Sequence, residues 1–301
     1  MSEFHVPVML SQVLDLLDPQ PGEFVVDGTV GHGGHAWELA LRIGKEGTLV
    51  AFDWDEAMLE TARARLADAP CKTLFVHADY REIPSWVAKN HPAGPDCVLL
   101  DLGVNWEHFA DPTRGFTFQE DAPLDMRMDR SRGEPAAAWL NRASFDEIRR
   151  VLSEFGGERH AAAIAKKIME RRRRGAMKTT QDLVQAVLDA IPPRLRERRI
   201  HPATRTFQAV RIVVNRELEG LEDAIRAIAL TLREGGRMAV LSYHSGEDRA
   251  TKLAFRSLGD EFETLTKKPL RPSGAEVATN PSARSARLRA VRRSRRLTEI
   301  S

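Results

Sequence analysis

The sequence is richest in glycine at residues 27–35, which read DGTVGHGGH and include Gly33, Gly34 and His35. Glycine has no Cβ, so such a turn lets a ligand approach the backbone closely and lets the chain adopt positive φ. The spacing matches neither the dinucleotide fingerprint GxGxxG nor the phosphate-binding GxxxxGK[ST]. The turn therefore predicts a ligand that is bound without a phosphate-binding loop. A tight turn that binds no ligand would have the same sequence pattern.

Carboxylates stand at or just after the ends of three further apolar runs. Asp53 and Asp101 each end a run, and Asp79 and Tyr80 follow a third. An acidic side chain at such a strand end can accept hydrogen bonds from both hydroxyls of a ribose, and a carboxylate beside an aromatic ring can flank an adenine. Together they favour a nucleoside ligand without phosphates, such as S-adenosylmethionine. A nicotinamide dinucleotide is the competing ligand, and each carboxylate alone could be a solvated strand end.

These residues can meet only if a parallel sheet brings its strand ends to one edge. Short apolar runs alternate with helical stretches in the first hundred residues and return near the end, which predicts an α/β fold. The predicted strands are residues 23–27, 48–53, 72–77, 96–101, 237–242 and 262–266. Between them lie about ninety residues with helical periodicity, including a capping box from Thr179 to Asp182. We therefore predict a discontinuous sheet domain, residues 1–110 and 205–301, and an inserted all-helical domain, residues 111–204.

The charge differs between the two parts of the chain. Residues 1–110 hold 7 Lys and Arg against 17 Asp and Glu, whereas residues 111–301 hold 38 against 26. Seven arginines and no acidic residue lie in residues 284–296, and residues 171–174 are all arginine. Guanidinium groups suit phosphate oxygens, so the pattern predicts an acidic half that binds a small molecule and a basic half that meets a polyanion. Solvated helix faces are the alternative, as are helix-end cations for residues 171–174.

Composition excludes several classes of protein. The 301 residues are 42% apolar and 29% charged, which is typical of a globular chain rather than a disordered or collagen-like one. No apolar run approaches the roughly 20 residues of a membrane-spanning helix, and the first residues do not resemble a signal peptide, so we expect a cytoplasmic protein without membrane association. Cys71 and Cys97 stand alone, so the sequence predicts neither a disulfide nor a metal site.

Seven ordered blocks of residues resemble one known family over almost the whole chain. The blocks are residues 5–10 (HVPVML), 27–35, 101–104 (DLGV), 114–116 with 123–129 (RGF and PLDMRMD), 201–212 (HPATRTFQAVRI), 243–249 (YHSGEDR) and 280–289. The chain thereby resembles the bacterial small-subunit ribosomal RNA cytosine-N4 methyltransferases, the RsmH/MraW family. The resemblance implies a Rossmann-like class I S-adenosylmethionine-dependent methyltransferase sheet with a helical insertion. It also implies methyl transfer to the exocyclic N4 amine of a cytosine in the decoding region of small-subunit rRNA.

The resemblance also assigns residues to the cofactor. The implied contacts are Gly33, Gly34 and His35 at the methionine end, Asp53 at the ribose, Tyr80 near the adenine, and Asp101, which closes the site. His108 stands where the family usually has a further cofactor contact, a glutamine. Asn105 and Trp106 replace a pair of serines, and Gly246 replaces a leucine. We expect cofactor binding to survive these departures, which leave the choice of target nucleotide open.

The expected chemistry is transfer to a weak nucleophile, because the lone pair of cytosine N4 is delocalised into the ring. The site must align the amine and stabilise positive charge as it develops on nitrogen. We predict Asp101 as the electrostatic stabiliser and Asn105 as an acceptor for the amine protons, with no metal. The target base must be unstacked, and the insertion and the basic segment are expected to hold the flanking RNA. The predicted RNA-binding residues are Arg205, Arg211, Arg284, Arg287 and Arg289.

Other interpretations remain open in the sequence. One is an RNA-binding ribosome assembly factor whose cofactor pocket is vestigial, and another is a methyltransferase with a shifted RNA target. A nicotinamide-dependent reductase is disfavoured by the glycine spacing. The expected partner is small-subunit rRNA, either free or in the small ribosomal subunit. The sequence leaves a homodimer open.

Overall fold

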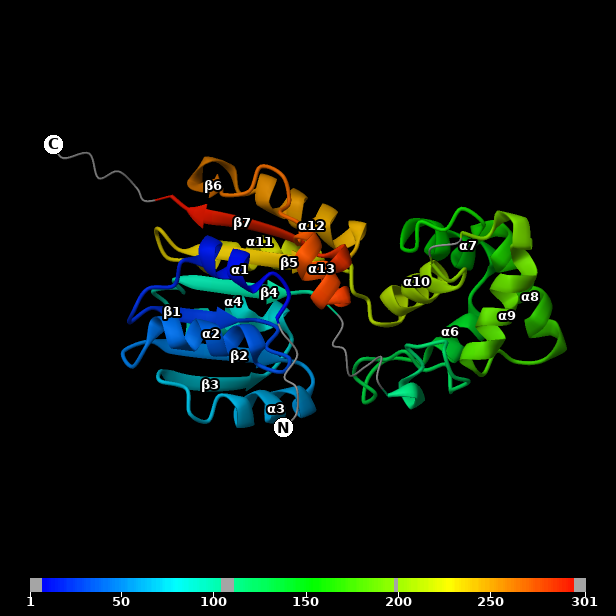
Figure 1. Ribbon diagram of the computed structural model, residues 1–301, viewed down its shortest axis with the longest axis horizontal. Helices are drawn as coiled ribbons and strands as arrows, with labels where there is room; N and C mark the ends of the chain where they lie inside the picture. Colours follow the sequence, from blue (N-terminus) through cyan, green and yellow to red (C-terminus); the bar gives the residue numbers. More distant parts are fainter. Residues whose placement is uncertain (1–6, 104–110, 198–199, 295–301) are drawn as a thin grey trace. The chain divides into compact units, whose positions relative to one another are not determined.

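The computed structural model describes residues 7–103, 111–197 and 200–294, which form two compact units (Figure 1). The first unit, the sheet unit, comprises Met1–Gly103 and Gly220–Ser301. The second, the helical unit, comprises Val104–Glu219. Each unit has its own hydrophobic core, so each is described by itself.

The sheet unit contains a seven-stranded sheet with the order β3-β2-β1-β4-β5-β7-β6. Its strands are β1 (Phe24–Asp27), β2 (Thr48–Asp53), β3 (Lys72–His77), β4 (Cys97–Asp101), β5 (Arg237–Ser242), β6 (Phe262–Thr264) and β7 (Arg287–Arg293). Strands β1 to β5 are parallel to one another, whereas β7 runs antiparallel to its neighbours β5 and β6. The α/β prediction is confirmed, and the parallel strands bring the ends of β1, β2 and β4 to one edge of the sheet.

Helices cover both faces of this sheet (Figure 1). They are α1 (Leu10–Leu17), α2 (Gly34–Ile43), α3 (Glu56–Arg65), α4 (Ile83–Asn90), α11 (Leu221–Thr231), α12 (Ser245–Arg256) and α13 (Gly274–Thr279). On one face, α1, α2 and α3 share a core with strand residues such as Ala51 and Leu99. Successive strand side chains point to opposite faces. Phe52 accordingly meets Trp86 of α4 on the other face, with ring centroids 5.6 Å apart.

The basic segment near the end of the chain forms part of the sheet. The arginines between residues 287 and 293 lie on β7, between β5 and β6. Leu288, Ala290 and Val291 of this strand are buried. The sequence analysis predicted no strand here, because arginine at nearly every second position obscures the apolar alternation that marks a strand. Most of the expected RNA-binding segment is therefore an interior strand.

The helical unit is built from five α-helices in the described residues. They are α6 (Ala136–Arg142), α7 (Phe145–Glu154), α8 (Ala161–Arg174), α9 (Thr180–Ala190) and α10 (Thr204–Val214). The predicted capping box is confirmed: the Thr179 side chain accepts from the Asp182 backbone N–H, and the Asp182 side chain accepts from the Thr179 N–H. The boundary predicted at residues 204/205 is wrong. Phe207 and Val210 of α10 are buried in the core of this unit, so the boundary falls after Glu219.

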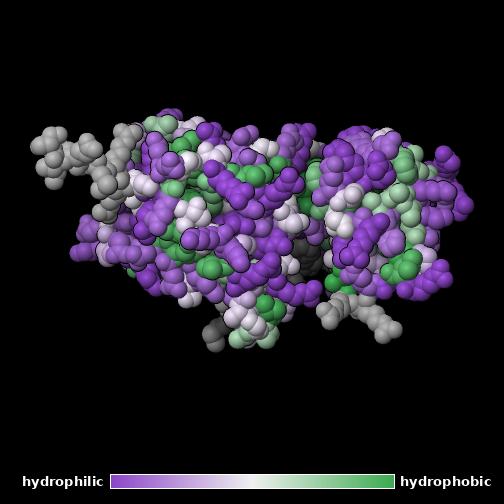
Figure 2. Space-filling model, turned by 90° about the horizontal axis from the view of Figure 1, so that it is seen from above, coloured by the Kyte–Doolittle hydropathy of each residue, from purple (hydrophilic) through white to green (hydrophobic). Residues whose placement is uncertain are grey.

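In the part of the chain that the structure describes, no helix combines the length and the apolar character needed to cross a membrane. Figure 2 shows a face that is mostly hydrophilic, on which the apolar areas are small and separate. Scattered apolar side chains of this kind are ordinary on a folded protein.

Candidate functional site

The glycine-rich turn links β1 to α2 and is fastened to β2. Gly31 and Gly33 have φ values of 48° and 73°, a region that side chains with a Cβ disfavour. The Gly31 N–H donates to Asp53 Oδ2 over 2.9 Å, and the Val30 N–H donates to the Phe52 carbonyl over 2.9 Å. Two glycines are therefore needed to bend the chain, and the β2 end fixes the bend.

Asp53 organises two loops besides standing at the predicted ribose position. Its Oδ2 accepts from Gly31, and its Oδ1 accepts from the Asp55 N–H over 3.0 Å. Asp55 in turn begins α3, where its side chain accepts from the Ala57 N–H. Through these two bonds Asp53 connects the glycine-rich turn to the start of α3, at the position predicted for the ribose.

Asp101 is held at the end of β4 by neighbours from three other segments. Its backbone N–H donates to the Thr29 hydroxyl over 2.6 Å. The Tyr243 hydroxyl donates to its carboxylate, and His35 Nδ1 lies 3.7 Å from Asp101 Oδ2. The carboxylate is 23% exposed, so a ligand at this edge of the sheet can reach it. This arrangement fits a fixed negative charge at the site.

His35 is a buried structural histidine. Its Nε2 lies 2.9 Å from the Val8 carbonyl, and burial lowers its pKa despite the opposing charge of Asp101. A neutral ring that donates from Nε2 to Val8 accounts for this contact. The side chain therefore fastens the segment before α1 to the glycine-rich turn, and only its backbone is left for the cofactor contact that the resemblance implies.

Two site residues were missed in the sequence analysis. Burial raises the pKa of Asp27 to about 7; the bond it accepts from the Thr29 N–H opposes this shift, and the charges of Asp101 and Asp53 add to it. Burial and the charge of Asp101 also raise the pKa of Tyr243 well above its usual range. Both residues end or directly follow strands next to β4, so applying the strand-end rule to every strand would have found them.

Tyr243 also explains why residue 103 is a glycine. A Cβ added to Gly103 would lie 2.6 Å from the Tyr243 ring, closer than real Cβ contacts allow. The ring thus packs against the backbone just after β4 while its hydroxyl reaches Asp101. Tyr243 therefore positions the strand end that carries the predicted stabilising carboxylate.

The remaining predicted cofactor residues lie in two places. Tyr80 is partly buried in a short 3₁₀-helix, Tyr80–Glu82, with the Arg81 guanidinium 4.8 Å from its ring centroid. Asp79 begins this helix and forms an ion pair with Arg81. The loop after β3 is therefore ordered around Tyr80. Asn105 and His108 lie outside the described residues.

The predicted RNA-binding arginines separate into two groups. Arg289 is buried and bonds Asp248 over 2.7 Å, and Arg211 forms two bonds to Glu217. These two side chains stabilise their own units, and their predicted contact with RNA stays a prediction. Arg287 lies partly buried on the same strand as Arg289. Arg284 is exposed, and Arg205 is partly exposed beside Glu197.

The arginine run that ends α8 is also partly structural. Arg171 donates to the Asp182 carbonyl, and Arg172 donates to the carbonyls of Leu140 and Ala143 at the end of α6. Residues 173–174 are exposed. Two arginines of this run therefore connect α8 to its neighbouring helices, and all four lie in the last turn of α8.

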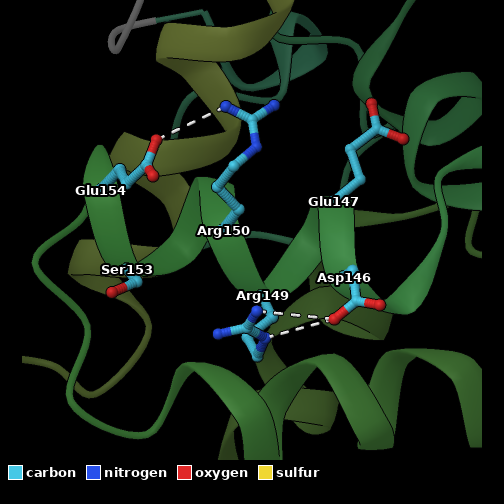
Figure 3. A pocket seen from close by; sticks show the side chains of 6 residues that line it. All are labelled: Asp146, Glu147, Arg149, Arg150, Ser153 and Glu154. Atoms are coloured by element: carbon cyan, nitrogen blue, oxygen red, sulfur yellow. Dashed lines mark hydrogen bonds and ion pairs between the residues drawn. The ribbon is translucent and has the colours of Figure 1, made fainter.

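One surface hollow lies along α7 and is lined by Asp146, Glu147, Arg149, Arg150, Ser153 and Glu154. Figure 3 shows Arg149 turned toward Asp146 and Arg150 turned toward Glu154. Pairs at i,i+3 and i,i+4 are usual on a solvated helix face. The hollow therefore does not compete with the strand-end site.

Comparison with known proteins identifies the family. The model of the MraW methylase family matches residues 2–294. A ribosomal RNA small subunit methyltransferase H of Syntrophotalea carbinolica is 44% identical, covering 96% of this chain and 98% of its own. The proteins of the same name from Geobacter sp. strain M21 (40% identical; 97% and 99% covered) and Thermotoga neapolitana (42%; 96% and 96%) are similarly close. The resemblance seen in the motifs is confirmed: the chain belongs to the MraW methylase family.

Proposed function

We propose that this protein transfers a methyl group from S-adenosylmethionine to the exocyclic N4 amine of a cytosine in the decoding region of small-subunit rRNA. The observation that carries the proposal is the match along nearly the whole chain to relatives named as small-subunit rRNA methyltransferases. The N4 position and the decoding region come from the family resemblance. This substrate implies a cytoplasmic protein whose partner is the small ribosomal subunit or its RNA.

The residues at the strand ends fit S-adenosylmethionine. This cofactor carries a sulfonium and an ammonium group. The site brings together the carboxylates of Asp27, Asp53 and Asp101, and the negative charges of Asp53 and Asp101 make ionisation of Asp27 less favourable. A bound cation would offset the repulsion between these carboxylates. Asp53 would hold the ribose, and the backbone after the glycine-rich turn would face the methionine end. When bound, the cofactor supplies an activated methyl group.

The chain itself supplies alignment and charge. The carboxylate of Asp101 is fixed by bonds from Tyr243 and at its own backbone by Thr29, so it does not have to reorganise as the reaction proceeds. A fixed negative charge stabilises positive charge that develops on the attacking nitrogen. Asn105, in the segment after β4, is the proposed acceptor for the amine protons.

Cofactor binding is expected to release a proton. Burial and the neighbouring carboxylates raise the pKa of Asp27 to about 7, and a bound cation would favour its ionised form. The Kd for S-adenosylmethionine should therefore fall as the pH rises from about 6 to 7.5. The decrease should be at most about tenfold, because an acid is about one-eleventh ionised when the pH is one unit below its pKa. Calorimetry in buffers with different ionisation enthalpies measures both effects.

The control for this prediction is Asp27→Asn, which keeps the shape of the side chain and cannot ionise. Its Kd should vary less with pH, and its proton release should decrease. If wild type and Asp27→Asn show the same pH dependence, Asp27 is not the group that couples protons to binding.

The proposed substrate is tested by methyl-labelled S-adenosylmethionine and ribosomal subunits from cells that lack the modification. We expect label in small subunits and none in large subunits. Cofactor binding without transfer to either would instead support an assembly factor with a vestigial pocket.

A further inference from the structure

A stack of aromatic rings runs from the core of the helical unit to its surface. Phe207 is buried, and its ring meets that of Phe118 edge to face, with centroids 5.0 Å apart and planes at 70°. Phe118 is partly buried and stacks on His201, with centroids 4.6 Å apart and planes at 25°. His201 is exposed. One face of its imidazole is covered by Phe118, which leaves the other as the end of the stack.

The outer ring of this stack is held in place. His201 Nδ1 accepts from the Ala203 N–H over 3.2 Å, just before α10 begins. The Phe118 carbonyl accepts from Gln181 Nε2 of α9 over 3.2 Å. Burial and the charge of Arg196 lower the pKa of His201, in keeping with a neutral ring whose Nδ1 is an acceptor. The stack is thus preorganised, and a planar ligand would pay little to order it.

Arginine side chains lie in the same part of the helical unit as His201. Arg196 is fixed by bonds to the carbonyls of Leu188 and Ile191 at the end of α9, close enough for its charge to act on His201. Arg205 lies one turn farther along the chain and pairs with Glu197, on which the charge of Arg159 also acts. The charges of Arg205 and Arg159 thus act on Glu197, and that of Arg196 acts on His201.

We propose that the exposed ring of His201 is a stacking site for an unpaired base of the RNA substrate. Flat rings bordered by arginines are what single-stranded RNA binds, because bases stack on the rings while guanidinium groups meet the phosphates. The inference rests on the proposed rRNA substrate. It concerns a second contact with that RNA and not the strand-end site.

Two substitutions separate stacking from the structural role of His201. His201→Asn removes the ring but keeps an acceptor for the Ala203 N–H, whereas His201→Phe keeps a ring and removes the acceptor. We expect His201→Asn to raise the Kd for a short labelled oligoadenylate about tenfold, and His201→Phe to stay within about twofold of wild type. The Kd for S-adenosylmethionine should be the same in all three proteins.

A direct readout of stacking is the fluorescence of 2-aminopurine placed in the same oligoadenylate. Wild type and His201→Phe should quench it on binding, and His201→Asn should not. The proposal is overturned if His201→Asn binds and quenches as wild type does, or if His201→Phe loses as much affinity as His201→Asn.

The test stays separate from the proposed function because RNA binding is measured without turnover. Wild type that binds and quenches but transfers no methyl group to small subunits would contradict the function and leave the stacking site standing. Wild type that methylates small subunits while His201→Asn binds RNA normally would contradict only the stacking site.

Discussion

Replacing Asp101 with alanine should lower the rate constant for methyl transfer about 100- to 1000-fold at saturating cofactor, the loss typical of removing one preorganised electrostatic group. The carboxylate is fixed by a hydrogen bond from Tyr243 and lies 3.7 Å from His35, so its charge is held in place before the reaction. Asp101→Asn should lose most of the same rate, because it keeps the shape and removes the charge. Single-turnover kinetics at several cofactor concentrations would separate this loss from weaker binding.

The matched control is Asp68→Ala, which removes an exposed carboxylate from the same unit. It should transfer methyl groups at the wild-type rate. An Asp101→Ala protein that is folded, binds cofactor and keeps the full rate would contradict the role assigned to Asp101.

Replacing Arg237 with alanine should cost about 3–5 kcal/mol of the free energy of unfolding, because it leaves the buried Glu23 carboxylate with only the half-exposed Arg233, 3.6 Å away, as an ion-pair partner. Arg237 and Glu23 are both buried and form two bonds of 2.9 and 3.0 Å. Arg237 also donates to the carbonyls of Leu17 and Asp18 after α1. Burial alone would raise the pKa of Glu23, but the bonds from Arg237 bring it below its usual value. Chemical denaturation would measure the loss.

The double variant Glu23→Leu with Arg237→Met tests the cause. Removing both charges should recover much of the stability lost in Arg237→Ala, since an apolar pair needs no desolvation of ions. Lys45→Ala, which breaks an exposed ion pair with Glu46, should leave the unfolding midpoint unchanged. A double variant no more stable than Arg237→Ala would mean that lost packing, and not the unpaired charge, dominates.

The strand ends of the site could be predicted from sequence because each follows a simple pattern. A buried parallel strand appears as an apolar run, so an acidic residue at its end, such as Asp53 or Asp101, stands out. The ion pairs could not be predicted this way. Arg211 and Arg289 look like free cations in sequence, yet their partners Glu217 and Asp248 become neighbours only through the fold.

The missed strand and the misplaced domain boundary have related causes. Strand β7 is interior, yet its arginines made it look like a solvated segment; the long side chain of Arg289 reaches a carboxylate on α12 from a buried position. Helix α10 has an apolar stripe that would suit either core, and periodicity alone does not say which one it joins. Tertiary packing decides whether β7 is an interior strand and which core α10 joins. Neither can be predicted from the local sequence pattern alone.

The central claim is that the chain methylates a cytosine of small-subunit rRNA at N4. Its most direct test is mass spectrometry of nucleosides from small subunits lacking the modification, after incubation with the pure protein and methyl-labelled S-adenosylmethionine. We predict labelled N4-methylcytidine that forms about 100- to 1000-fold more slowly with Asp101→Ala. Label in a different nucleoside, or none despite cofactor binding seen by calorimetry, would contradict the claim.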